Sequence, residues 1–67
     1  MTKPQFKVGD LVKAQLKMGH KNIVIDKDDV GMVVDEYDNF SHCYLIYYFK
    51  QCRVIKTLYS YIGRYDG

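Results

Sequence analysis

Residues 42–58, HCYLIYYFKQCRVIKTL, decide the fold of this 67-residue chain because they contain its two strongest strand signals side by side. His42–Phe49 and Cys52–Leu58 are rich in β-branched and aromatic residues, and a two-residue break separates them. This pattern predicts an antiparallel hairpin. A loop of two or four residues places Tyr48 opposite Arg53, and a loop of three shifts the pairing by one. The first register also pairs Tyr47 with Val54, Ile46 with Ile55 and Leu45 with Lys56.

The two faces of this hairpin differ in their residues, because side chains alternate along a strand. One face carries Cys43, Leu45, Tyr47, Phe49, Cys52, Val54 and Leu58, and the other carries Tyr44, Ile46, Tyr48, Arg53, Ile55 and Thr57. Neither face is polar. A small barrel fills its interior from one face of each strand, so one apolar face of the hairpin is surplus to the core.

Shorter signals surround the hairpin. A turn at Gly9-Asp10 precedes a strand that begins at Leu11, and a second strand covers Val30–Tyr37. Residues 15–29 are a long loop with a brief hairpin or edge strand inside it. Residues 59–67 form a short tail that holds a single helical turn or a last short strand.

Five short strands without an amphipathic stretch of helical length predict a small, strongly bent antiparallel barrel. The runs FKVGDLV at 6–12, VGMVVD at 30–35 and YLIYYF at 44–49 resemble the SH3-like barrel. Within that class they are most similar to the small SH3-like proteins of tailed bacteriophages, and they are also similar to KOW and Tudor-like barrels. The resemblance covers residues 6–58 and implies an all-β, five-stranded SH3-like barrel, so residues 1–67 are expected to form a single domain.

Length and charge limit the function. A chain of 67 residues forms one domain at most, which excludes large multi-domain enzymes. The net charge is only +2, but residues 1–21 hold five Lys and one Asp, whereas residues 22–41 hold six acidic residues and one Lys. Strong nucleic-acid binders are more basic overall, and a dipolar surface of this kind can orient a molecule against a neighbour.

No residue pattern indicates catalysis, a metal or a cofactor. Cys43 and Cys52 do not face one another in the hairpin, so they are predicted to be buried free thiols. His20 and His42 lack the spacing of a zinc site with these cysteines. The acidic turn Asp26–Asp29 lacks the Glu that would complete a calcium loop, so it is predicted to be solvated. We therefore predict a protein that is not an enzyme and binds no metal or cofactor.

The cellular location follows from two features. The first seven residues have no apolar segment, so a secretory signal peptide is not expected, and two cysteines favour a reducing compartment. The longest uncharged apolar run, Cys43–Phe49, has seven residues and is too short to cross a bilayer.

The second hairpin face is the predicted partner-binding surface. Tyr44, Ile46, Tyr48 and Ile55 would form an exposed apolar patch with Arg53 among them. Tyr and Arg are enriched at binding hot spots, because they combine a large contact area with a polar end. The alternative is that the long loop or the Tyr-rich tail folds back and covers this patch.

Three functions from different classes are compatible with these features. The first is a non-enzymatic protein-interaction module that binds a protein partner or forms a homo-oligomer. The phage resemblance makes it a virion component that contacts capsid, neck or tail proteins, or a protein that acts on a host factor, located in the virion or the host cytoplasm. The second is a KOW-like nucleic-acid-binding barrel that uses Lys13, Lys17 and Lys21 on phosphates. The third, a cryptic enzyme or metal protein, is least supported.

Overall fold

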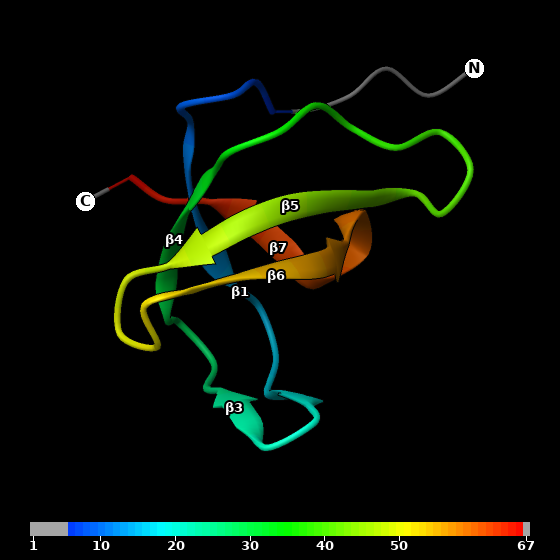
Figure 1. The fold of residues 1–67 in the computed structure, drawn as a ribbon. Helices are drawn as coiled ribbons and strands as arrows, with labels where there is room; N and C mark the ends of the chain where they lie inside the picture. The colour runs from blue at the N-terminus through cyan, green and yellow to red at the C-terminus, as the bar shows by residue number, and fades with distance from the viewer. Residues whose placement is uncertain (1–5, 67) are drawn as a thin grey trace.

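The computed structural model describes residues 6–66, and its regular structure is almost entirely β (Figure 1). In chain order the elements are β1 (Leu11–Ala14), β2 (Met18–His20), β3 (Ile23–Ile25), β4 (Val30–Val33), β5 (Cys43–Tyr48), β6 (Arg53–Leu58), the 3₁₀ turn η1 (Tyr59–Tyr61) and β7 (Ile62–Arg64). No helix in this part of the chain is long and apolar enough to span a membrane.

Five strands form one antiparallel sheet in the order β6-β5-β4-β1-β7, and β2 pairs with β3 in a separate two-stranded sheet. The larger sheet is strongly curled, and the β2–β3 hairpin lies below it in the view of Figure 1. This is the half-barrel of a small SH3-like fold, so the predicted fold class is confirmed.

The central hairpin has the predicted register. Tyr48 pairs with Arg53, Ile46 with Ile55 and Cys43 with Leu58. The loop contains the four residues between Tyr48 and Arg53. It closes with a hydrogen bond of 2.8 Å from the Cys52 amide to the Tyr48 carbonyl, and Cys52 has a φ of 54°. The four-residue alternative is therefore the one that forms.

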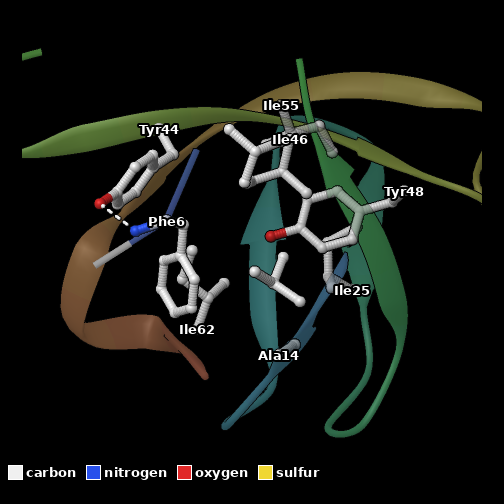
Figure 2. Close-up of a cluster of buried hydrophobic side chains, with 10 residues drawn as sticks. Phe6, Ala14, Ile25, Tyr44, Ile46, Tyr48, Ile55 and Ile62 are labelled. Carbon is white, nitrogen blue, oxygen red and sulfur yellow. Dashed lines mark hydrogen bonds between the residues drawn. The ribbon is translucent and has the colours of Figure 1, made fainter. Parts of the chain in front are cut away.

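The core lies on the concave side of the curled sheet. Its members are Phe6, Val12, Ala14, Ile25, Val33, Tyr44, Ile46, Tyr48, Ile55 and Ile62. Figure 2 shows them in one cluster, to which every strand except β2 contributes along with Phe6 from the segment before β1. Burial of these side chains is the main force that holds so short a chain together.

Two tyrosines can be buried because their hydroxyl groups have partners. The Tyr44 hydroxyl oxygen accepts a hydrogen bond of 3.2 Å from the Phe6 amide (Figure 2). The Tyr48 hydroxyl lies 2.8 Å from the Thr57 hydroxyl inside the barrel. A buried phenol without a partner would cost the free energy of desolvating its hydroxyl. Burial also raises the pKa of Tyr48, so this ring stays neutral.

The loop predicted at residues 15–29 contains the β2–β3 hairpin. Ile25 anchors it in the core, where the side chain is 1% exposed. The Gln51 side chain, at the tip of the central hairpin, donates from Nε2 to the Val24 carbonyl at 3.0 Å and to Asp29 Oδ2 at 2.8 Å. The Lys50 ammonium lies 3.4 Å from Asp26, with both groups mostly in solvent. The two hairpins are thus joined through polar contacts as well as through Ile25.

We expect Gln51→Ala to loosen the β2–β3 hairpin and to lower the free energy of unfolding by about 1 kcal/mol. The Gln51 Oε1 atom is buried without a hydrogen-bond partner among the described residues, which offsets part of what Nε2 contributes. Amide hydrogen exchange over residues 23–29 should become faster. Lys50→Ala is the matched control, since an exposed ion pair contributes less than about 0.5 kcal/mol. Equal effects of the two substitutions would contradict the bridging role of Gln51.

The tail contains both of the elements that its sequence suggests. The helical turn η1 comes first, and β7 follows and pairs with β1. Gly63 lies inside β7 opposite Lys13, so it does not end the last element. The Tyr59 amide donates to the His42 carbonyl at 2.9 Å, which joins the tail to the start of β5.

Candidate functional site

The residues predicted to bind a partner lie mostly inside the barrel, so that prediction is wrong. Tyr44 is 1% exposed, Ile46 and Tyr48 are 0% exposed, and Ile55 is 6% exposed. Of the five predicted residues only Arg53 is exposed, and it is the first residue of β6. The four apolar side chains are the interior of the sheet. Ile25, from the predicted loop at 15–29, and Ile62, from the predicted tail, lie in the same core cluster as these four side chains, so the alternative in which the loop or the tail covers this face is confirmed in part.

The face of the hairpin that points inward is set by its neighbour β4. Gly31 pairs with Tyr48, and Val33, which is fully buried, pairs with Ile46. A Cβ atom at Gly31 would lie 2.5 Å from Ile46 Cγ2, so β4 and β5 approach closely on the inner face of the sheet. One signal in the sequence also indicated that the face with Leu45 points outward. Lys56 is paired with Leu45 and lies on the same face, and a lysine is rarely buried.

Sequence reasoning therefore missed an apolar row on the outside of the sheet. Val54, Tyr47, Met32 and Leu11 are paired in register across β6, β5, β4 and β1. Tyr65 continues the row beyond β7, where its amide donates to the Leu11 carbonyl at 3.2 Å. Val54 is 51% exposed, Leu11 42% and Tyr65 37%, and Tyr47 and Met32 between them are half-buried.

Two shorter apolar rows flank this one. On one side Val34 lies beside Leu45, and its amide donates to the Leu45 carbonyl at 2.9 Å. On the other side Phe49 lies beside Val30, and its amide donates to the Val30 carbonyl at 3.2 Å. We refer to Leu11, Val30, Met32, Val34, Leu45, Tyr47, Phe49, Val54 and Tyr65 as the outer face. Two lysines border it: Lys56 is paired with Leu45, and Lys13 with Val30.

Tyr47 lies near the centre of the outer face. Its ring packs edge-on against Phe49, with centroids 5.6 Å apart. A hydrogen bond with the Cys52 side chain raises the pKa of Tyr47, so the phenol is neutral at physiological pH. The ring pair is held in place on the convex surface and presents an apolar area to solvent.

A depression of about 300 Å³ opens beside the outer face, between β5, β6 and the segment that follows β4. We call it the acidic pocket. Its lining includes Asp35, Glu36, Asp38, Cys43, Tyr44, Leu45 and Lys56. Leu45 belongs to both the pocket and the outer face, so the two are continuous.

Asp38 is the carboxylate of this pocket with the most polar contacts among the described residues. Hydrogen bonds from the Phe40 amide at 2.9 Å and the Ser41 hydroxyl at 2.8 Å hold the pKa of Asp38 below its ordinary value. The Lys56 ammonium lies 3.5 Å from the same carboxylate. Asp38 is therefore ionised at neutral pH and already has a cation beside it.

An aromatic cluster lies at the end of β5 that is nearest η1. The Tyr37 hydroxyl is 2.7 Å from His42 Nδ1, and the Tyr37 and His42 rings lie 6.4 Å and 6.3 Å from the Tyr59 ring. Burial raises the pKa of Tyr37, with a further contribution from Tyr59. These contacts join the segment after β4 to η1, which is a structural role.

The three lysines of the nucleic-acid hypothesis do not lie on one element. Lys17 and Lys21 are exposed and flank β2, whereas Lys13 is half-buried on β1. The turn after β3 adds the acidic residues Asp26, Asp28 and Asp29 to the same part of the chain. Phosphate binding by these lysines stays a prediction.

The cysteines are free thiols, as predicted, but only Cys43 is partly buried, and Cys52 is exposed at the loop. Burial of both was therefore wrongly predicted. Within residues 6–66 there is no group of three His, Cys, Asp or Glu side chains that could hold a metal ion. In the acidic turn, the Asp29 carboxylate accepts the Asp26 amide at 2.9 Å.

Comparison with known proteins finds no matching family model, no similar curated protein and no similar solved structure. The candidate site thus consists of the outer face and the acidic pocket beside it.

Proposed function

We propose that this protein is a non-enzymatic interaction module that binds another protein through the outer face. The observation that carries the proposal is the apolar row that crosses β6, β5, β4 and β1 and continues at Tyr65, with Tyr47 and Met32 near its centre. An antiparallel sheet with one solvated face normally alternates apolar and polar side chains, so the solvated face is polar. Contiguous apolar surface on a small monomer is typical of an interaction site.

The phage resemblance extends this proposal to the setting of the interaction. Small SH3-like barrels of tailed phages suggest a structural or accessory component of a virion, with capsid, neck or tail proteins or a second copy as the partner. The support for this setting is the resemblance of the runs at 6–12, 30–35 and 44–49. The outer face supports docking in any of these settings.

Val54→Lys is expected to abolish partner binding without unfolding the protein. Val54 is 51% exposed on β6, so the folded monomer tolerates a charge there, but burying that charge under a partner is costly. Tagged protein, purified from the cells in which it is naturally made, should retain specific proteins that mass spectrometry identifies. Light scattering after size-exclusion chromatography should report any self-association.

The matched control is Val24→Lys, because Val24 is 50% exposed on β3 and does not belong to the outer face. The control should keep every partner that Val54→Lys loses. If both variants retain the same proteins and the same oligomeric state as the unmodified chain, the outer face is not the docking surface. A nucleic acid that co-purifies with all three and is released by salt would favour the lysine hypothesis instead.

A further inference from the structure

We propose that the partner is a segment of a different protein that carries Lys or Arg next to apolar side chains, with the apolar side chains on the outer face and the cation in the acidic pocket. This inference rests on the proposed function. It adds the chemistry that the partner must have.

The first argument is continuity. Leu45 lines the acidic pocket and is also part of the outer face, so one bound segment can contact both. Val34, the residue after β4, lies beside Leu45 of β5, and the chain continues directly from Val34 to Asp35 and Glu36. The acidic side chains are thus placed at the border of the apolar rows, where a hydrophobic interface has its polar rim.

The second argument is charge. The pocket has three carboxylates and one ammonium group, Lys56, which is 3.5 Å from Asp38. Within the described part of the chain, neither Asp35 nor Glu36 forms an ion pair. The Asp35 carboxylate accepts the Glu36 amide at 2.7 Å, which uses one of its oxygens locally. Two carboxylates therefore remain for a cation from outside, so complementary charge favours a basic group of the partner at this end of the outer face, whereas Lys13 borders the opposite side.

The third argument is shape, and it favours a different protein over a second copy. The outer face is the convex side of the curled sheet, and two convex faces touch over only part of their area. A segment or groove of another protein can follow the curvature and cover the whole face.

The test selects binders from a yeast-displayed library of random short peptides, with the folded protein as the target and Val54→Lys as the counter-target. We expect the enriched peptides to combine apolar residues with Lys or Arg. Enriched peptides that are acidic, or that show no bias in charge, would overturn the basic partner while leaving the outer face as a docking surface. Equal enrichment on the target and on Val54→Lys would overturn both proposals.

The enriched peptides then allow a charge test by fluorescence anisotropy. Glu36→Gln should weaken binding about three-fold and Glu36→Lys roughly ten-fold, and high salt should reduce the difference. Asp28→Asn is the matched control: it also removes one exposed carboxylate, from the turn before β4, and Asn tolerates the φ of 74° at this position. Unchanged affinity for Glu36→Lys, or equal losses for Glu36→Gln and Asp28→Asn, would contradict a cation site in the acidic pocket.

Discussion

Ile46→Ala is expected to cost about 2–5 kcal/mol of unfolding free energy, which is most of what a core of this size supplies. Ile46 is fully buried and pairs with both Val33 and Ile55 at the centre of the sheet. Removing its branched side chain leaves a cavity that rigid neighbouring strands cannot close. Urea denaturation followed by circular dichroism should show a variant that is largely unfolded or unfolds at low urea.

The control for this experiment is Val54→Ala on the outer face. Val54 is 51% exposed, so its truncation should cost less than about 1 kcal/mol. The pair tests which side of the hairpin is the interior. If Val54→Ala costs as much as Ile46→Ala, the assignment of the two faces is incorrect, and with it the outer face as a docking surface.

Gly31→Ala is the second substitution with a large expected effect, at about 3 kcal/mol. The new Cβ atom would lie 2.5 Å from Ile46 Cγ2 and 2.8 Å from the Tyr47 carbonyl oxygen. The carbonyl belongs to the backbone of a paired strand and cannot move aside as the end of a flexible side chain can. The β4–β5 pairing must therefore separate locally. Thermal unfolding and the amide exchange of residues 43–48 would measure the loss.

Gly19→Ala provides the comparison, because Gly19 also lies in a strand and has no described atom within 4 Å of its added Cβ. Its effect should stay within about 0.5 kcal/mol. A similar loss at both glycines would mean that the cost comes from backbone flexibility rather than from the close approach of β4 and β5.

Much of the fold could be predicted from local patterns. The central hairpin follows from strand periodicity and from the break in β-branched and aromatic residues between its strands. The pairing that forms, with a loop of four residues, was one of the predicted alternatives. The β2–β3 hairpin and the last strand were each predicted as one of two alternatives. The predicted strand 30–37 is shorter in the structure, because β4 ends at Val33 although Val34 still bonds to Leu45.

An apolar surface on the central hairpin was predicted from the sequence, but it was assigned to the face that is buried in the structure. The hairpin has two apolar faces, as expected, and one of them is partly exposed. Alternation assigns residues to the same face but does not say which face is inside. Lys56 was the available clue, since its partner Leu45 belongs to the face that had been assigned to the core.

The amino-acid sequence alone placed the main strands, limited the central hairpin to two registers and indicated a surplus apolar face, because these depend on a period of two residues and on turn residues close along the chain. The tertiary structure alone decided which face became the surface. That choice depends on contacts between distant residues: Gly31 gives room for Tyr48 and Ile46 to pack against β4, and Val12 and Ala14 of β1 close the same side. Within the hairpin only Lys56, paired with Leu45, indicates which face is outside, and one lysine does not fix the packing of the other strands.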